Sequence, residues 1–190
     1  MPEQTHTHEH EHDHAHKLSV YEFLGRILAE PLDETLRYNA CNSEFWDDLR
    51  PKLSNLRTMG ALNAIEKAVS KLGDIPQGEL ESTLNSEYEQ VFCGDDPLMP
   101  PCEHAYGMET SDVYAIAHDL GVASSLHAHL PHDHIASELL MLAPIDEGRE
   151  LSREQLVKLA DYFESHPMKL AQRMLDAATG KEDTTSGFYQ

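Results

Sequence analysis

Apolar residues recur at spacings of three and four along most of the chain, which predicts α-helices. The first stripe occupies residues 20–28 and ends before Pro31, because a proline cannot continue a helix. Further stripes occupy residues 45–56, 62–72, 80–92, 113–120, 135–142, 156–163 and 170–175. No segment alternates β-branched and polar residues with a period of two. We therefore expect an all-α protein, a single-domain bundle of several helices.

Prolines and glycines predict where these helices are interrupted. Pro51 lies inside the second stripe, where it either kinks or divides a helix that Ser43 is expected to cap. Residues 94–107 combine glycines, prolines and two aspartates, a composition typical of turns and not of helix. A second irregular stretch is expected over residues 122–132.

Residues 1–16 differ from everything that follows, because histidine occupies every second position and apolar residues are almost absent. The alternating histidines are His6, His8, His10, His12, His14 and His16. We expect a disordered arm over 1–16 and a folded domain over 17–190. Neutral imidazoles on one edge of an extended arm can bind Zn²⁺, Ni²⁺ or Cu²⁺. The alternative is a solvated tail that only changes charge near the ordinary histidine pKa of about 6.5.

The charge of the chain limits its partners. It has 190 residues, with 14 Lys and Arg against 34 Asp and Glu and a net charge of −20. Such acidity disfavours nucleic acid as a partner and favours basic peptides. The arm holds only four of the acids, so the acidity belongs to the folded domain.

Targeting and cysteine signals are weak. No apolar run approaches the ~20 residues of a membrane helix, and the N-terminus lacks the basic start and apolar stretch of a signal peptide. Three cysteines without a CxxC pair argue against a disulfide framework. We therefore expect a cytoplasmic protein without stable membrane insertion.

A histidine cluster at 127–134 superficially resembles the HxHxDH zinc motif of metallo-β-lactamase-like hydrolases. The spacing is interrupted by Pro131 and His132, and that motif belongs beside strands, which this pattern does not predict. We expect instead that Asp133, alone or with His134, opens the helix that begins at Ile135. A zinc hydrolase is the least favoured alternative.

The loop after residue 94 offers a different kind of site. Cys93, Cys102 and His104 match no known zinc spacing, and no signature of nucleophilic catalysis is present. Glu103 and Tyr106 lie on a proline-rigidified loop, where binding residues concentrate. The alternative is a structural turn in which Glu103 pairs with an arginine.

Two segments together carry a family resemblance. Glu-Tyr-x-x-Val-Phe-x-Gly occupies 87–94 and Pro-Pro-x-Glu-x-x-Tyr occupies 100–106. Pro131 and an Asp-His pair then precede an Ile-Ala-Ser-Glu-Leu helix that ends in Met141. These signatures, in this order, resemble the TorD/DmsD/NarJ family of redox-enzyme maturation chaperones, over about residues 18–178. His132 is an additional residue relative to the commoner Pro-Asp-His form, and the family's last helix is expected to be truncated at 186–190.

The resemblance implies a function. It implies a cytoplasmic chaperone, not an enzyme, that binds the apo catalytic subunit of a molybdopterin-dependent oxidoreductase and its twin-arginine leader peptide. It assists cofactor insertion and delays export until the subunit is folded. The chaperone itself requires no cofactor and is expected as a monomer or homodimer; any Ni or Zn on the arm would be adventitious.

A leader peptide has two arginines followed by an apolar stretch, so its receptor needs carboxylates beside an apolar groove. We expect one wall of this site to carry Glu103, Tyr106, Asp133 and His134, with Glu103 and Asp133 facing the arginines. Glu138 either joins them or serves only its helix. The alternative function is a His-rich accessory protein that delivers Ni²⁺ or Zn²⁺ to a client enzyme.

Overall fold

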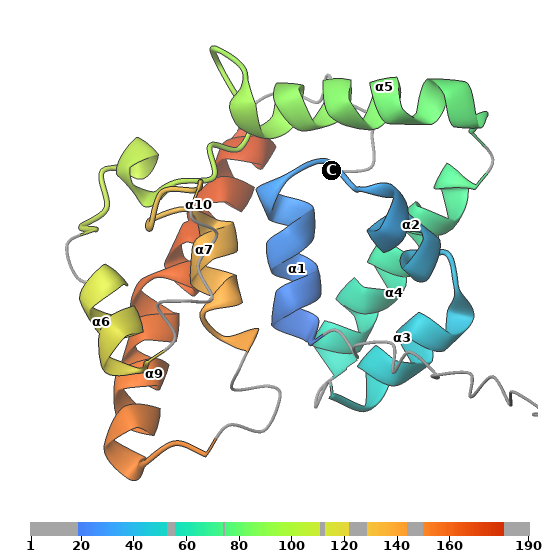
Figure 1. The fold of residues 1–190 in the computed structure, drawn as a ribbon. Helices are drawn as coiled ribbons and strands as arrows, with labels where there is room; N and C mark the ends of the chain where they lie inside the picture. Colours follow the sequence, from blue (N-terminus) through green and yellow to red (C-terminus); the bar gives the residue numbers. More distant parts are fainter. Residues whose placement is uncertain are drawn as a thin grey trace, which may run out of the picture.

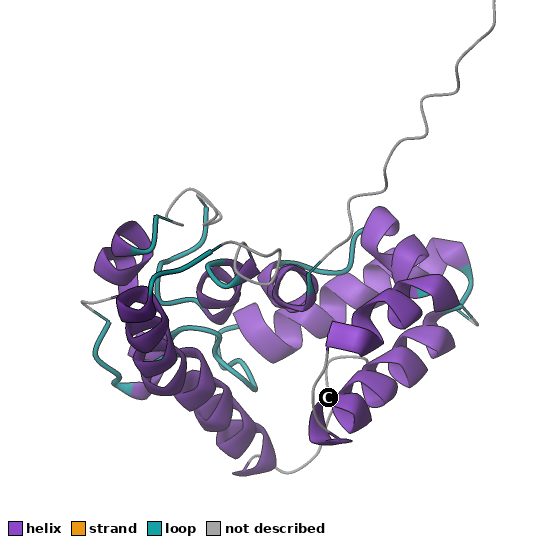
Figure 2. Ribbon diagram, turned by 90° about the horizontal axis from the view of Figure 1, so that it is seen from below, coloured by secondary structure: helices purple, strands orange, loops and turns teal. Residues whose placement is uncertain are grey.

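The computed structural model describes most of the chain between residues 19 and 180. The described residues are 19–52, 56–73, 75–110, 113–121, 129–143 and 150–180. Their regular secondary structure is helical, with no strand, which confirms the expected all-α class (Figure 2). The expected arm, 1–16, and the expected truncated helix, 186–190, lie outside these residues. Among the described helices, none is both long and apolar enough to cross a membrane.

Helix α1 (Val20–Ala29) lies between two groups of helices (Figure 1). The first group contains α2 (Glu34–Ala40), α3 (Ser43–Leu49), α4 (Leu56–Leu72) and α5 (Gln77–Tyr88). The second contains α6 (Val113–Asp119), α7 (Ile135–Leu140), α9 (Arg153–Ser165) and α10 (Pro167–Gly180). Single helical turns join them, namely η1 (Arg50–Lys52), the π-helical η2 (Glu89–Cys93) and η3 (Glu103–Tyr106).

Side-chain caps fix where several of these helices begin. The Ser19 hydroxyl accepts the backbone N–H of Glu22 at 2.9 Å and so begins α1. For α3 the expected cap was wrong by one residue: Asn42 accepts the N–H of Glu44 at 3.0 Å, and Ser43 is the first helical residue. Pro51 divides the second stripe, since α3 ends at Leu49 and the 3₁₀ turn η1 follows.

The sequence predicted turns over the whole region 94–107, but part of this region is helical. Residues Glu103–Tyr106 form the 3₁₀ turn η3, and Gly107 ends it with a φ of 66°, in the left-handed region that glycine adopts without strain. This helical turn begins at Glu103, whose side chain is buried.

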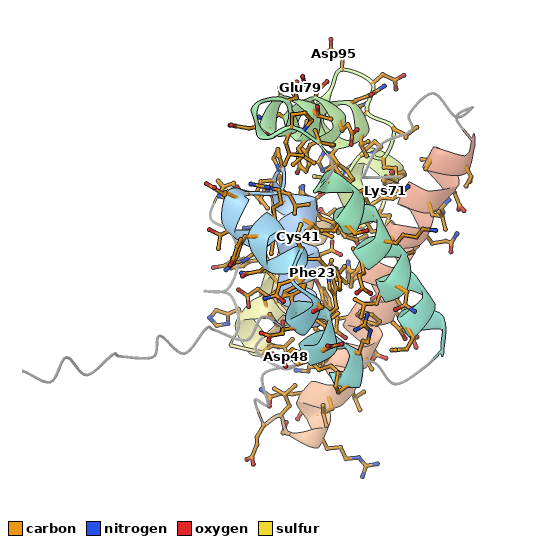
Figure 3. All side chains as sticks on the ribbon, turned by 90° about the vertical axis from the view of Figure 1, so that its right-hand side faces the viewer. Phe23, Cys41, Asp48, Lys71, Glu79 and Asp95 are labelled. Atoms are coloured by element: carbon orange, nitrogen blue, oxygen red, sulfur yellow. The ribbon has the colours of Figure 1, made fainter. Side chains whose placement is uncertain are left out.

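In the described part of the chain the core consists of three clusters of buried side chains, and side chains of α1 belong to or pack against all of them. Leu24 and Leu28 pack against both the α1–α5 cluster and a cluster built around Phe92, Ile135 and Leu170. Tyr21 packs against this second cluster and against the third, on α6 and α9. Figure 3 places Phe23 inside the packed side chains and Asp95 at the edge of the molecule. Side chains of α1 therefore take part in the packing of all three clusters.

The contact between α1 and α7 is close because α1 carries a glycine there. A Cβ atom on Gly25 would lie 2.6 Å from Cγ of Leu140 and 3.3 Å from the carbonyl oxygen of Ala136. Neighbouring helices approach this closely only where one of them lacks a side chain. Gly25 thus holds α7, the helix of the second signature, directly against the centre of the fold.

Candidate functional site

The two signature segments are joined in the structure. Residues 101–103 and 133–135 run antiparallel and pair through their backbones: Glu103 N–H donates to the carbonyl of Asp133 at 2.9 Å, and Ile135 N–H donates to that of Pro101 at 2.8 Å. We call residues 101–106 and 131–138 together the junction. The resemblance was drawn on segments about thirty residues apart, and the fold brings them into contact.

Asp133 links the two halves of the junction through its side chain. Its Oδ2 atom accepts the backbone N–H of His104 at 3.1 Å and lies 2.6 Å from Nδ1 of the same histidine. Asp133 therefore does not cap α7, although its position before Ile135 predicted that it would. The other member of the expected pair does so: Nδ1 of His134 accepts the N–H of Ala136 at 3.1 Å.

The role of His134 defines its protonation. An Nδ1 atom that accepts a hydrogen bond carries no proton, so the ring is neutral with its proton on Nε2. Burial is the main cause that lowers the pKa of His134 to about 4, although the Asp133 charge opposes it. His134 is thus a neutral cap at neutral pH and not a cation.

Glu103 is fully buried and pairs with a residue that was not among the expected site residues. Its Oε1 atom lies 2.9 Å from Nδ1 of His166, the last residue before α10. The ring of Tyr162 stacks on that of His166 with centroids 5.1 Å apart. Burial raises the pKa of Glu103, and the neighbouring His166 opposes this. The expected alternative partner, an arginine, is replaced by a histidine from sixty-three residues further along the chain.

Beside this pair lies a second buried carboxyl group. Glu138 is 0% exposed, and neither of its oxygen atoms has a hydrogen-bond partner among the described residues. The same holds for Oε2 of Glu103 and for the hydroxyl oxygens of Tyr106 and Tyr162. Burial, followed by the charges of Glu103 and Asp133, raises the pKa of Glu138 to about 9. Glu138 is therefore a neutral acid at neutral pH.

The five residues expected to bind the leader are thus brought together, but mostly away from solvent. Glu103, Glu138, Asp133 and His134 are buried, and Tyr106 is half-buried. A side chain that arrives from solvent does not reach Glu103 or Glu138 in this conformation. The junction tethers α7 to the start of α10.

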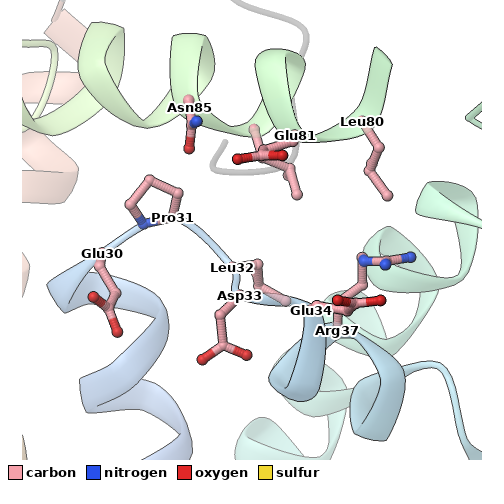
Figure 4. Close-up of a pocket in the computed structure, with 10 residues that line it drawn as sticks. Glu30, Pro31, Leu32, Asp33, Glu34, Arg37, Leu80, Glu81 and Asn85 are labelled. Atoms are coloured by element: carbon pink, nitrogen blue, oxygen red, sulfur yellow. The ribbon is translucent and has the colours of Figure 1, made fainter. Parts of the chain in front are cut away.

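Two hollows open near the C-terminal end of α1, and no residue pattern indicates either of them in advance. An apolar groove of about 360 Å³ lies between α1, α4 and α10 and is lined by Ile27, Leu28, Ile65, Met99, Met174 and Leu175, among others. A hollow of about 450 Å³ lies between the α1–α2 turn and α5 (Figure 4). Its acidic lining consists of Glu30, Asp33, Glu34 and Glu81, with Arg37 the one basic residue.

Both hollows are bounded by the end of α1 or the turn that follows it. Leu28 lines the groove and Glu30, two residues later, lines the acidic hollow. In Figure 4 the carboxyl groups of Asp33 and Glu34 lie below Glu81, which projects from α5. The Tyr88 hydroxyl donates to the Leu28 carbonyl at 3.0 Å and fixes α5 over the end of α1. The last turn of α1 and the α1–α2 turn thus border an apolar surface and an acidic one.

The histidines at 127–134 do not converge in the described part of the chain. His127 lies outside it, and the six arm histidines do too. His129 and His132 are exposed, and His132 lies beside the Tyr114 ring, with centroids 4.8 Å apart. His134 is occupied as a cap, so none of these three joins a group of metal-ligating side chains among the described residues.

Comparison with known proteins leaves the residues as the sole guide to function. No protein-family model matches the chain, and neither a curated protein nor a solved structure matches it. The function is therefore inferred from the residues and their geometry.

Proposed function

We propose that this protein is a chaperone of the TorD/DmsD/NarJ type. It binds the apo catalytic subunit of a molybdopterin-dependent oxidoreductase, together with the twin-arginine leader of that subunit, and is not an enzyme. The observation that carries this proposal is that an apolar groove and an acidic hollow both lie at the end of α1. Together they offer the apolar surface and the carboxylates that suit a peptide in which arginines adjoin an apolar stretch.

The acidic hollow supplies the charge. Glu34 and Glu81 are exposed at its mouth, so their carboxylates are open to two guanidinium groups. Guanidinium and carboxylate form paired, charge-assisted hydrogen bonds. The net charge of −20 raises the association rate with a basic peptide. In this arrangement the arginines bind beside the α1–α2 turn.

The apolar groove supplies most of the binding energy. Its lining comes from α1, α4, α7 and α10, with Phe92 and Met99, and includes Leu175, whose side chain is about half exposed. Covering apolar area contributes about 25 cal/mol per Å². A leader whose apolar stretch folds as a helix can bury one face here, in the helix-in-groove manner. The junction maintains this groove, because Ile135 of α7 and Met174 of α10 both line it.

The test is direct binding of a labelled leader peptide to the full chain, followed by fluorescence anisotropy. Glu34→Gln with Glu81→Gln should weaken binding roughly threefold to tenfold, since exposed charge pairs contribute about 0.2–1 kcal/mol each. Leu175→Asp should weaken binding more strongly, because it places a charge in the apolar groove.

Two controls separate this site from general acidity. Glu150→Gln with Glu164→Gln removes the same charge at two exposed positions, one three residues before α9 and one near its end, and should leave affinity nearly unchanged. A peptide with glutamines in place of both arginines should lose its salt dependence. Equal affinity for both double variants would remove the hollow from the site, and no binding of any leader would overturn the proposed function.

A further inference from the structure

Three side chains with metal-binding atoms meet at the surface of the junction. Cys102 Sγ, a ring nitrogen of His104 and a carboxylate oxygen of Asp133 all lie within 4.8 Å of one another. The antiparallel backbone pairing of 101–103 with 133–135 sets this arrangement, because it places Cys102 opposite His134 and next to Asp133. Sequence spacing gave no such signal, since the third member comes from thirty residues away.

The three atoms are close to the arrangement that zinc requires. Zinc bonds of about 2.0–2.3 Å at tetrahedral angles place ligand atoms roughly 3.3–3.6 Å apart. His104 and Asp133 are at present closer than this, 2.6 Å apart, because they form a hydrogen bond. A metal in place of the proton of that bond would move the two groups apart by less than ~1 Å.

Accessibility permits an ion to enter. The His104 side chain is 67% exposed, whereas that of Asp133 is 11% exposed and Cys102 is partly buried. His104 can therefore turn without disturbing the core, while the other two ligands stay fixed by the backbone pairing.

We propose that Cys102, His104 and Asp133 bind one divalent transition-metal ion and leave its fourth coordination position open. The three types of ligand favour Zn²⁺ as this ion. Thiolate, imidazole and carboxylate together suit zinc better than Mg²⁺ or Ca²⁺, which prefer oxygen alone. On binding, Cys102 releases its proton to solvent, and the imidazole keeps one proton on the nitrogen that does not bind. Thiolate and carboxylate then balance the two positive charges of the ion.

The surroundings of Cys102 disfavour a free thiolate. Burial and the nearby charges of Asp133 and Glu138 raise the pKa of Cys102 to about 12. The same three residues are therefore poorly suited to act as a nucleophile with its base, since a thiol of this kind is protonated at neutral pH.

The site is distinct from the His-rich arm and independent of the proposed chaperone function. A zinc ion here would connect η3 to the start of α7 and so tie the two halves of the junction together. Because His104 is exposed, water or a side chain of a partner can complete the coordination.

The experiment uses the full chain in which the six arm histidines, at 6, 8, 10, 12, 14 and 16, are replaced by glutamine. Titration with ZnCl₂ by calorimetry, in a reductant that does not bind zinc, should give one ion per chain. Co²⁺ should produce a thiolate-to-metal absorption band in the near ultraviolet. Zinc should also raise the thermal unfolding temperature.

Two variants with matched controls decide the outcome. Cys102→Ser and His104→Gln should each weaken zinc binding at least about a hundredfold, since loss of an outer partner alone costs roughly 10–100-fold. Cys41→Ser and His118→Gln, at exposed positions away from the cluster, should leave binding unchanged. His104 is exposed, so its variant keeps the fold, and circular dichroism of the metal-free proteins checks this. Zinc binding that survives both variants, or cobalt spectra without the thiolate band, would overturn the proposal.

Discussion

Oε1 of Glu103 lies 2.9 Å from Nδ1 of His166, and both side chains are shielded from water. Glu103 belongs to the loop of the first signature, whereas His166 ends α9 and precedes α10. One buried pair therefore connects the signature loop to the corner between the last two helices. Tyr162 covers the histidine ring from one side and restricts its orientation.

Replacing Glu103 with glutamine should destabilise the fold. The amide keeps the shape of the side chain but removes the charge that the His166 ring N–H donates to, and buried hydrogen bonds to charged groups contribute roughly 1.5–3 kcal/mol. We expect the free energy of unfolding, measured with urea and circular dichroism, to fall by about that amount. The exposed replacement Glu164→Gln should change it by less than about 0.5 kcal/mol. Equal values for the two variants would mean that the pair contributes nothing to stability.

Glu138 should make the protein less stable as the pH rises. Its pKa is about 9 in the folded protein against an ordinary value of 4.5, so the folded state binds more protons than the unfolded state between these values. Stability from this group is complete below pH 4.5 and is lost as the pH rises through 9. Protonation of His134, which has the opposite effect on stability, contributes only below pH 6.5. Urea unfolding at pH 6.5, 7.5 and 8.5 should show a decline that is smaller in Glu138→Gln.

The comparison for Glu138 is the pH slope and not the absolute stability. The amide of the variant is as buried as the acid, so a constant offset between the two proteins is expected and decides nothing. Parallel pH profiles for the two proteins would show that Glu138 does not titrate as its surroundings require.

His134 should have the opposite effect in acid. Its folded pKa of about 4 lies below the ordinary value of 6.5, so the unfolded state takes up a proton first as the pH falls. The stability from this group is present above pH 6.5 and is lost as the pH falls through 4. His134→Asn keeps a side chain that caps well but does not titrate. Its unfolding free energy should decrease less than that of the natural protein between pH 6.5 and pH 4.5.

An alanine variant separates the cap from the titration. His134→Ala removes the acceptor for the Ala136 N–H and should lower stability by about 1 kcal/mol or more at pH 7, where His134→Asn retains the bond. If both variants were equally stable at pH 7, the hydrogen bond to Nδ1 would have no energetic role.

Two glycine-to-alanine replacements should change stability in opposite directions. At Gly25 the new methyl group meets Leu140 at 2.6 Å, and overpacking of this kind costs about 1–3 kcal/mol. At Gly60, the fifth residue of α4, nothing lies within 4 Å of the added Cβ. Alanine there should therefore add about 1 kcal/mol through helix propensity. Thermal unfolding of the two variants measures both, and a gain at Gly25 would contradict the close packing of α1 on α7.

The helices were predictable because their signals are local. Apolar spacing identified α1, and Pro31 and Gly94 mark places where helices end. The error at Ser43 was one residue, because asparagine and serine cap equally well and only the backbone decides between them. Local chemistry therefore predicts the elements well, and their exact boundaries less well.

The candidate site was predictable only in part because its contacts are not local. The resemblance identified Glu103 and Asp133, but nothing in the sequence indicates that Glu103 pairs with His166 or that Asp133 pairs with His104. For the same reason the sequence does not show which of Asp133 and His134 caps α7. Both can cap a helix, and the approach of His104 from another segment determines which one does.

Helix α1 also has a consequence for how the chain reaches its final form. Its close partner α7 is synthesised more than a hundred residues later, as the contact between Gly25 and Leu140 shows. While a ribosome is still producing the middle of the chain, α2 to α5 can assemble beside α1, but its other side has no partner. Contacts between such distant parts form late and slow the folding of a domain. The nascent protein is therefore committed to its fold only when the second signature has emerged.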